Sequence, residues 1–136
     1  INQRSRVDEG DILMPMIGTI GNPVIAKFDK PFAIKNVALI KFYSDSRIDR
    51  GFLKALLGSM EFQAHFEHQA SGSTQRFIPL GFIRKLGIPV PALETQRVIV
   101  AEIEAEQVLV MANKQLIERF ESKIKATINR AWCSAE

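Results

Sequence analysis

The chain has 136 residues, of which 46% are hydrophobic and 24% charged, and its formal net charge at pH 7 is +3. This length and composition fit one domain with a hydrophobic core, and they exclude two large domains. No apolar run approaches the roughly 20 residues of a membrane-spanning helix, the opening stretch is too polar for a secretory leader, and the single cysteine, Cys133, excludes an internal disulfide, so we expect a cytoplasmic protein.

Short apolar runs separated by turn residues predict a β-rich first half. One run covers residues 11–17, a second covers 24–28 after Gly21-Asn22-Pro23, and a third covers 32–42. Glycine, asparagine and proline between such runs are typical of tight turns between strands. Gly18 and Gly21 allow sharp turns or a close approach of another part of the backbone. These runs therefore predict a small, strongly bent sheet or a partial barrel.

A helix is expected next, because apolar residues recur at helical spacing from Phe52 to Met60 behind a capping Asp49. Gly58 weakens this helix locally without forbidding it. Residues 71–75 break every periodicity and predict a loop. Ile88-Pro89-Val90-Pro91 cannot be helical throughout, so this stretch predicts a rigid extended connector.

The last element is expected to be one long helix, because residues 93–132 contain no proline and no glycine. Apolar residues recur there every seventh position, and others widen the same stripe. A stripe of this length cannot be buried by about 90 preceding residues alone, so we predict a helix–helix interface with polar breaks at Glu106, Asn113 and Thr127. Its core residues are expected to be Ile103, Val110, Ile117, Phe120 and Ile124.

Charge and periodicity together predict an α+β fold in two parts. Residues 1–93 contain twelve Lys and Arg against eight Asp and Glu, a net of 12 − 8 = +4, whereas residues 94–136 have a net of 6 − 7 = −1. A basic first part suits a polyanion, and a nearly neutral helix suits protein. We expect a β-rich first domain over residues 1–91 and a long coiled-coil helix over residues 92–136.

Four segments of the sequence are similar to the specificity subunits of type I restriction–modification systems. They are Gly10-Asp11-Ile12-Leu13 with Gly18-Thr19-Ile20-Gly21, the helix near Phe52 with Leu56-Leu57, the loop at residues 72–78 that matches a Gly-Ser-x-Gln pattern, and residues 88–96, which match Ile-Pro-x-Pro-x-Leu-Glu-x-Gln. They occur in the order and at the spacing of that family, and they cover nearly the whole chain.

The resemblance implies a DNA-reading component without a catalytic site. In that family, two target-recognition domains each precede a long helix, and the helices pack antiparallel as a spacer. Modification subunits dock on the helices and methylate adenine at N6, and restriction subunits join to cleave. The sequence matches one recognition domain, with its N-terminal part missing, and one helix. Its ending from Lys123 to Trp132 also resembles proteins in which a methyltransferase is fused to a specificity module. Two origins of the chain therefore stay open, a separate subunit and a piece of such a fusion.

The candidate DNA contacts are the hydroxyl, amide and basic side chains of predicted loops. Ser73, Thr74 and Gln75 can bond base edges or phosphates, and Arg76 can pair with phosphate or guanine. A purely structural loop that caps its own backbone is the alternative. The secondary candidates are Lys35, Asn36, Arg47 and Arg50, each of which can also be ordinary solvated surface.

Two rival functions follow from the same residues. The chain can be an assembly module that only dimerises or docks a methyltransferase through its helix. It can also be a hydrolase in which Ser73 acts with His65 or His68, although no base is placed by the sequence. No Gly-x-Gly-x-x-Gly pattern or Asn-Pro-Pro-Tyr type of motif occurs. Metal binding by the two histidines would need a further ligand and a defined geometry, so an exposed helix end is the preferred interpretation. We therefore expect no cofactor and no metal.

Overall fold

The computed structural model of the chain describes residues 6–18, 20–27, 34–70 and 76–133. Contacts between residues divide the chain into two compact units, Ile1–Val100 and Ala101–Glu136. The first unit contains a small sheet, three short helices and the first two turns of a long helix. The described part of the second unit is the rest of that helix. This arrangement is α+β, as the sequence predicts.

The sheet of the first unit has three antiparallel strands in the order β2-β1-β3. Strand β1 (Ile12–Pro15) lies in the centre, between β2 (Val24–Ile25) and β3 (Val37–Ile40). In the register, Ile12 faces Ile25 on one side and Ile40 on the other. Each strand lies within one of the apolar runs that predict it, and parts of the second and third runs lie outside the described residues.

Two capped helices follow where one was predicted. Asp49 caps α1 (Arg50–Leu57) by accepting a hydrogen bond from the Phe52 N–H at 3.0 Å, as expected. The expected continuation to Met60 is wrong: Gly58 ends α1, and Ser59 caps a second helix, α2 (Met60–Gln69). The Gly58 N–H donates back to the carbonyl oxygen of Lys54 at 3.0 Å, which closes the last turn.

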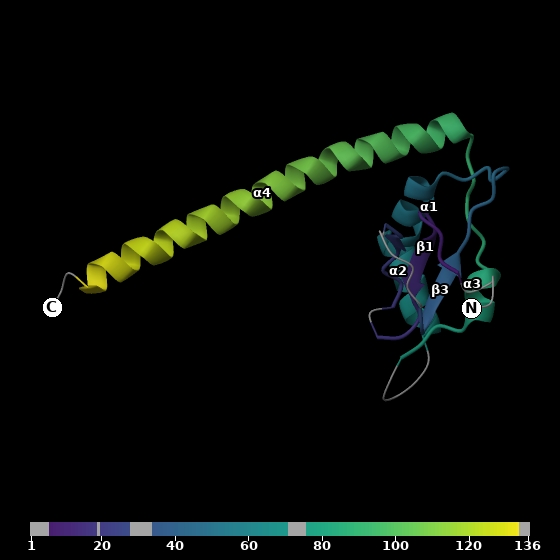
Figure 1. Cartoon of the computed structure of the whole chain (residues 1–136), viewed down its shortest axis with the longest axis horizontal. Coiled ribbons are helices and arrows are strands. Elements are labelled where there is room, and N and C mark those ends of the chain that lie inside the picture. Colours follow the sequence, from purple (N-terminus) through teal and green to yellow (C-terminus); the bar gives the residue numbers. More distant parts are fainter. Residues whose placement is uncertain (1–5, 19, 28–33, 71–75, 134–136) are drawn as a thin grey trace. The chain divides into compact units, whose positions relative to one another are not determined.

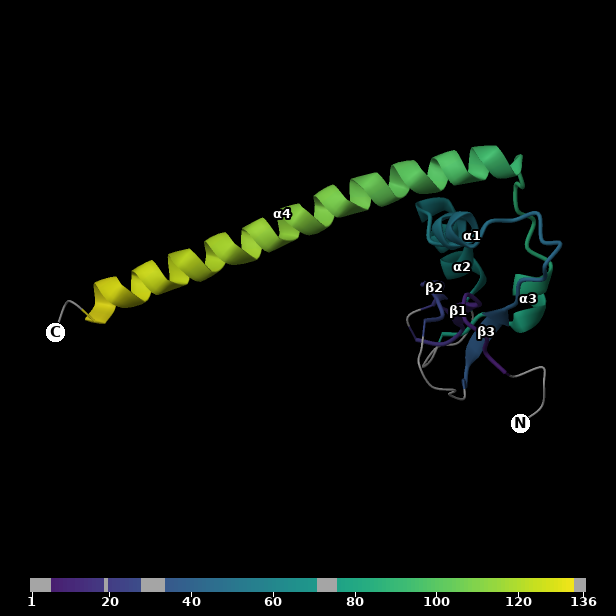
Figure 2. The same cartoon turned by 45° about the horizontal axis from the view of Figure 1, so that its top comes forward.

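The core of the first unit lies between the sheet and these helices (Figure 2, which shows α1 and α2 next to each other). Ile12 and Met14 from β1, Leu53 and Leu57 from α1 and Phe66 from α2 are buried together. The Phe66 ring meets the Phe82 ring edge-on, with centroids 6.4 Å apart. Phe82 lies in α3 (Leu80–Arg84), which lies beside β3 (Figure 1).

Glycines permit the turn after β1, as expected. Gly18 and Gly21 have φ values of +78° and +75°, which side chains rarely adopt. A Cβ atom at Gly21 would also lie 2.7 Å from the Phe66 ring, whereas one at Gly18 would meet nothing within 4 Å. The chain can therefore turn tightly against the core at Gly21 only because no side chain is present.

The long helix predicted from the sequence is confirmed as α4 (Leu93–Cys133), with 41 residues. It corresponds to about 61 Å at about 1.5 Å per residue. Residues 87–92 before it are not helical, as the two prolines predict. Within the described residues, no helix is both long and apolar enough to cross a membrane.

Candidate nucleic-acid interface

Backbone hydrogen bonds bring two predicted DNA-contacting segments to one end of the sheet. The Met16 N–H donates to the Asn36 carbonyl oxygen at 3.1 Å, and the Ile78 N–H donates to the Met16 carbonyl oxygen at 2.9 Å. Ile17 and Phe77 form an isolated antiparallel bridge beside them. The segments around Asn36 and Phe77, about 40 residues apart in sequence, therefore meet just beyond β1.

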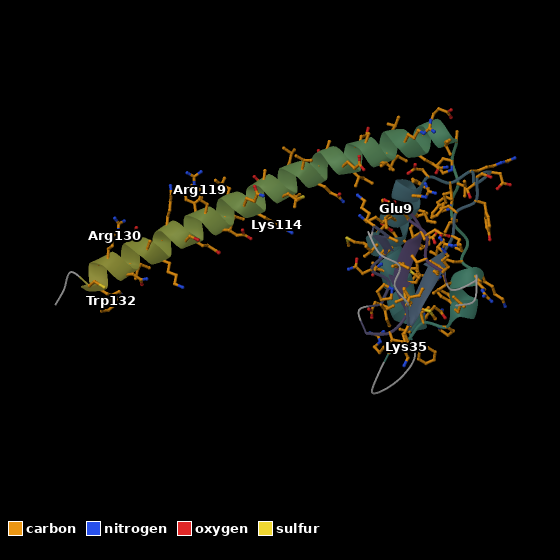
Figure 3. The ribbon with its side chains drawn as sticks, viewed as in Figure 1. Glu9, Lys35, Lys114, Arg119, Arg130 and Trp132 are labelled. Carbon is orange, nitrogen blue, oxygen red and sulfur yellow. The ribbon has the colours of Figure 1, made fainter. Side chains whose placement is uncertain are left out.

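This end of the sheet, which we call the loop end, presents a mixed polar and aromatic surface. All five of its residues, Gly18, Lys35, Asn36, Arg76 and Phe77, are exposed. Figure 3 labels Lys35 there. Asn36 has a φ of +59°, a left-handed conformation that asparagine tolerates better than most residues. An ammonium group, a carboxamide and a guanidinium group together supply donors for phosphates and base edges.

Arg76 is held in place by the end of α2. Its Nη1 atom forms an ion pair with a carboxylate oxygen of Glu67, and its Nη2 atom donates to the Glu67 carbonyl oxygen at 2.6 Å. A guanidinium has five N–H donors, so others are left beyond these two. Ser73, Thr74 and Gln75, predicted to contact bases, lie outside the described residues.

Arg47 and Arg50 lie elsewhere. The Arg50 guanidinium sits over the Phe42 ring, 5.2 Å from its centroid. A Cβ atom at Gly10 would lie 3.0 Å from the Nε atom of Arg50. Gly10 precedes β1 and Phe42 follows β3, so Arg50 belongs to the end of the sheet opposite the loop end. Arg47 is exposed in the connection between β3 and α1, which also contains Phe42. The structure therefore does not unite these two arginines with Lys35 and Asn36.

Sequence reasoning missed an ion cluster at this opposite end. The Lys41 Nζ atom donates to carboxylate oxygens of Asp8 at 2.7 Å and Asp11 at 3.0 Å, and to the Arg6 carbonyl oxygen at 3.1 Å. The hydrogen bond with Asp8, followed by that with Asp11, raises the pKa of Lys41, and the bond from Lys41 lowers the pKa of Asp8. No local sequence pattern could reveal it, because the partners are 30 or more residues apart.

The predicted interface residues of α4 keep their apolar side chains exposed. Val110, Ile117, Phe120 and Ile124 are each exposed by more than half, and Ile103 is half-buried. At 3.6 residues per turn, Arg119 lies about 200° around the helix from Ile117. Figure 3 shows Arg119 and Arg130 on one side of α4 and Lys114 on the other. The predicted interface residues form an apolar stripe, which we call the apolar face, but charged side chains lie on both sides of α4, and Val108 and Met111 are exposed outside this stripe.

The two histidines considered as catalytic or metal-binding residues are both exposed in α2. His65 is exposed, and its ring packs on Phe82 with centroids 5.3 Å apart. His68 is exposed at the end of α2. Among the described residues, no three His, Cys, Asp or Glu side chains are grouped as metal ligands. A hollow of about 590 Å³ between β3 and α3 is lined mainly by aliphatic side chains, with Lys41 and Arg84 also in its lining.

The comparison with protein families decides the identity. Residues 2–128 match the family model described as "Type I restriction modification DNA specificity domain". The chain belongs to this family. The match includes both the sheet-containing part and most of α4. A search of curated proteins found no match. Members of this specificity-domain family are recognition domains rather than catalytic ones, and they recognise DNA sequence in type I restriction–modification systems.

Proposed function

We propose that this specificity domain reads one half of a double-stranded DNA target and directs partner subunits to it. A modification subunit would methylate adenine at N6, and a restriction subunit would cleave. The observation that carries the proposal is the family match over residues 2–128, which includes the sheet and most of α4. The domain contributes recognition and spacing, and its partners contribute the chemistry. We take residues 1–91 as the recognition part and residues 92–136 as the helical spacer.

The loop end is the proposed reading surface. Lys35, Asn36 and Phe77 are exposed there, and the predicted base readers, Ser73, Thr74 and Gln75, precede Arg76 directly in sequence. Asparagine and glutamine carboxamides match the adenine edge, and lysine or arginine pairs with phosphate or guanine. Arg47 and Arg50, at the opposite end of the sheet, are proposed as separate phosphate contacts that add affinity without sequence preference.

The apolar face of α4 is proposed to pair antiparallel with a second copy of the helix. Residues 101–111 contain three glutamates and no basic residue, whereas residues 112–133 contain five Lys and Arg against two Glu, a net of 5 − 2 = +3. Antiparallel packing places the acidic half of one helix beside the basic half of the other, whereas parallel packing places like charges together. Glu106 and Asn113 interrupt the apolar face, which favours packing within a larger assembly.

An assembly module without DNA binding is the second candidate. The exposed apolar residues of α4 favour it, because patches of this kind mark protein interfaces. It predicts a dimer that binds a methyltransferase and shows no preference among DNA sequences. The two candidates therefore differ in one measurable property, which is sequence-dependent DNA binding.

Selection from a random double-stranded DNA library by the full chain tests the proposal. We expect an enriched motif, and we expect affinity for it to fall steeply with salt, by a log–log slope of about 0.9 for each phosphate contacted. Lys35→Gln should lower that slope by about 0.9, whereas Lys54→Gln, which changes an exposed lysine of α1, should leave it unchanged.

The outcomes separate the candidates. An enriched motif with salt-dependent affinity supports DNA reading. A dimer that binds a methyltransferase but enriches no motif supports the assembly module instead. Equal salt slopes for the Lys35 and Lys54 variants would remove the loop end as a phosphate-contacting surface.

A further inference from the structure

The first turns of α4 contain an unusual buried amide. Gln96 is 0% exposed, although helix-start glutamines ordinarily face water. Its Oε1 atom accepts a hydrogen bond from the Asp49 N–H at 2.7 Å. Its Nε2 atom donates to the carbonyl oxygens of Arg47 at 3.0 Å and Pro91 at 2.8 Å. One side chain therefore joins the start of α4 to the connection between β3 and α1.

The bonding pattern requires both halves of a carboxamide. The Asp49 N–H needs an acceptor and the two carbonyl oxygens need two donors. Only asparagine and glutamine side chains present one acceptor and two donors together. Asparagine is shorter by one methylene. Glutamate keeps the acceptor but loses both donors, and methionine keeps the approximate shape but loses all three bonds. Without Gln96, these three partly buried backbone groups would lose this hydrogen-bond partner.

A second contact lies one turn further along the same face of α4. A Cβ atom at Gly51 would lie only 3.0 Å from the Val100 Cγ1 atom and 3.3 Å from Cγ2. Gly51 lies inside α1, where glycine is unfavourable to a helix. The close approach explains its presence. Gln96 and Val100, four residues apart, thus both pack on the start of α1.

We propose that Gln96 is a positioning residue that fastens the start of α4 to the DNA-reading part of the chain. This proposal rests on the proposed function in one respect. If each DNA-reading domain is attached firmly to its spacer helix, the two half-sites of the DNA target are recognised at one fixed spacing. Gln96 touches no DNA in this proposal. It acts through the backbone of residues 47–49, and Asp49 in turn caps α1.

The attachment is tested by distance measurements between two spin labels on the full chain. Labels are placed at Lys54→Cys in α1 and Ala112→Cys in α4, with Cys133→Ser removing the natural thiol. All three positions are exposed. Labelled chains are mixed with excess unlabelled chains, so that only distances within one chain are measured. We expect Gln96→Met to widen the distance distribution at least twofold.

Gln63→Met is the matched control. Gln63 also donates to two backbone carbonyl oxygens, those of Gly21 and Leu57, but both lie inside the sheet-and-helix unit. The Gln63→Met variant should therefore be less stable than the wild type, with an unchanged distribution of label distances. Gln96→Glu and Gly51→Ala provide second variants that disturb the same attachment, should Gln96→Met fail to fold, and both are expected to widen the distribution.

DNA selection gives the functional readout. The Gln96→Met variant should enrich the same half-site motif as the wild type, but with two or more half-site spacings in place of one. The Gln63→Met variant should keep one spacing. Unchanged label distances in all of the Gln96 and Gly51 variants, or equal widening in the Gln63 control, would overturn the inference. If the wild type enriches no motif, the proposed function fails, while the label distances still decide whether Gln96 fastens the helix.

Discussion

The α4 pairing can be tested by two valine substitutions that differ only in the face of the helix they change. Val110 lies on the apolar face and is 51% exposed, whereas Val108 is 66% exposed and lies about 200° around the helix from it. We expect Val110→Ala to weaken dimerisation and Val108→Ala to leave it unchanged. Both substitutions raise helix propensity equally, so that effect cancels in the comparison.

The size of the effect follows from the area that a partner helix can cover. Valine to alanine removes two carbon groups, each contributing about 0.8 kcal/mol when fully buried. A partner can newly cover about half of Val110, so the loss is about 0.8 kcal/mol per copy and about 1.6 kcal/mol per dimer. Since about 1.4 kcal/mol corresponds to a tenfold change, the dimer dissociation constant should rise about 15-fold.

Sedimentation velocity over a dilution series measures that constant for the wild type and both variants. A ratio near 15 between the two variants supports pairing through the predicted face. Equal dissociation constants for Val110→Ala and Val108→Ala would refute the choice of face. A wild-type chain that stays monomeric at every concentration would refute pairing between two copies altogether.

Three further predictions concern the sheet-containing unit, each measured by urea unfolding. Both Gly21→Ala and Gly18→Ala place a side chain at positive φ, which should lower the free energy of unfolding by about 1–2 kcal/mol. Gly21→Ala should lower it further, because only there does the added Cβ atom collide with Phe66. Equal losses of unfolding free energy would contradict the close approach at Gly21. Phe66→Ala should lower the free energy of unfolding by about 3–5 kcal/mol, because this 0% exposed ring joins α2 to the core. A decrease of less than about 1 kcal/mol would show that Phe66 is not a core residue. Lys41→Met should cost stability only between two pH limits. Asp8, whose pKa is lowered from 3.8, loses its contribution as pH falls through its folded-state pKa, and Lys41, whose pKa is raised from 10.5, loses its own as pH rises through its folded-state pKa. A difference between wild type and variant that is constant from pH 2 to pH 12 would contradict the ion cluster.

Local sequence signals predicted the elements that depend on neighbouring residues. The absence of proline and glycine after residue 92 and the sevenfold apolar repeat predicted α4, and Asp49 predicted the start of α1. The same reasoning misjudged Gly58, because a glycine inside an apolar helical pattern and a glycine that ends a helix look alike until the following cap is recognised. Ser59 was the missed signal.

The amino-acid sequence alone determined the family, the α+β class and the long helix, because each depends on spacing along the chain. Only the tertiary structure decided which candidate residues share a surface: it brought the segments of Asn36 and Arg76 to one end of the sheet and separated both from Arg50. It also revealed the role of Gln96, whose partners at residues 47 and 49 are nearly 50 residues away in sequence. A buried polar group is defined by what surrounds it, and those surroundings exist only once the chain has folded.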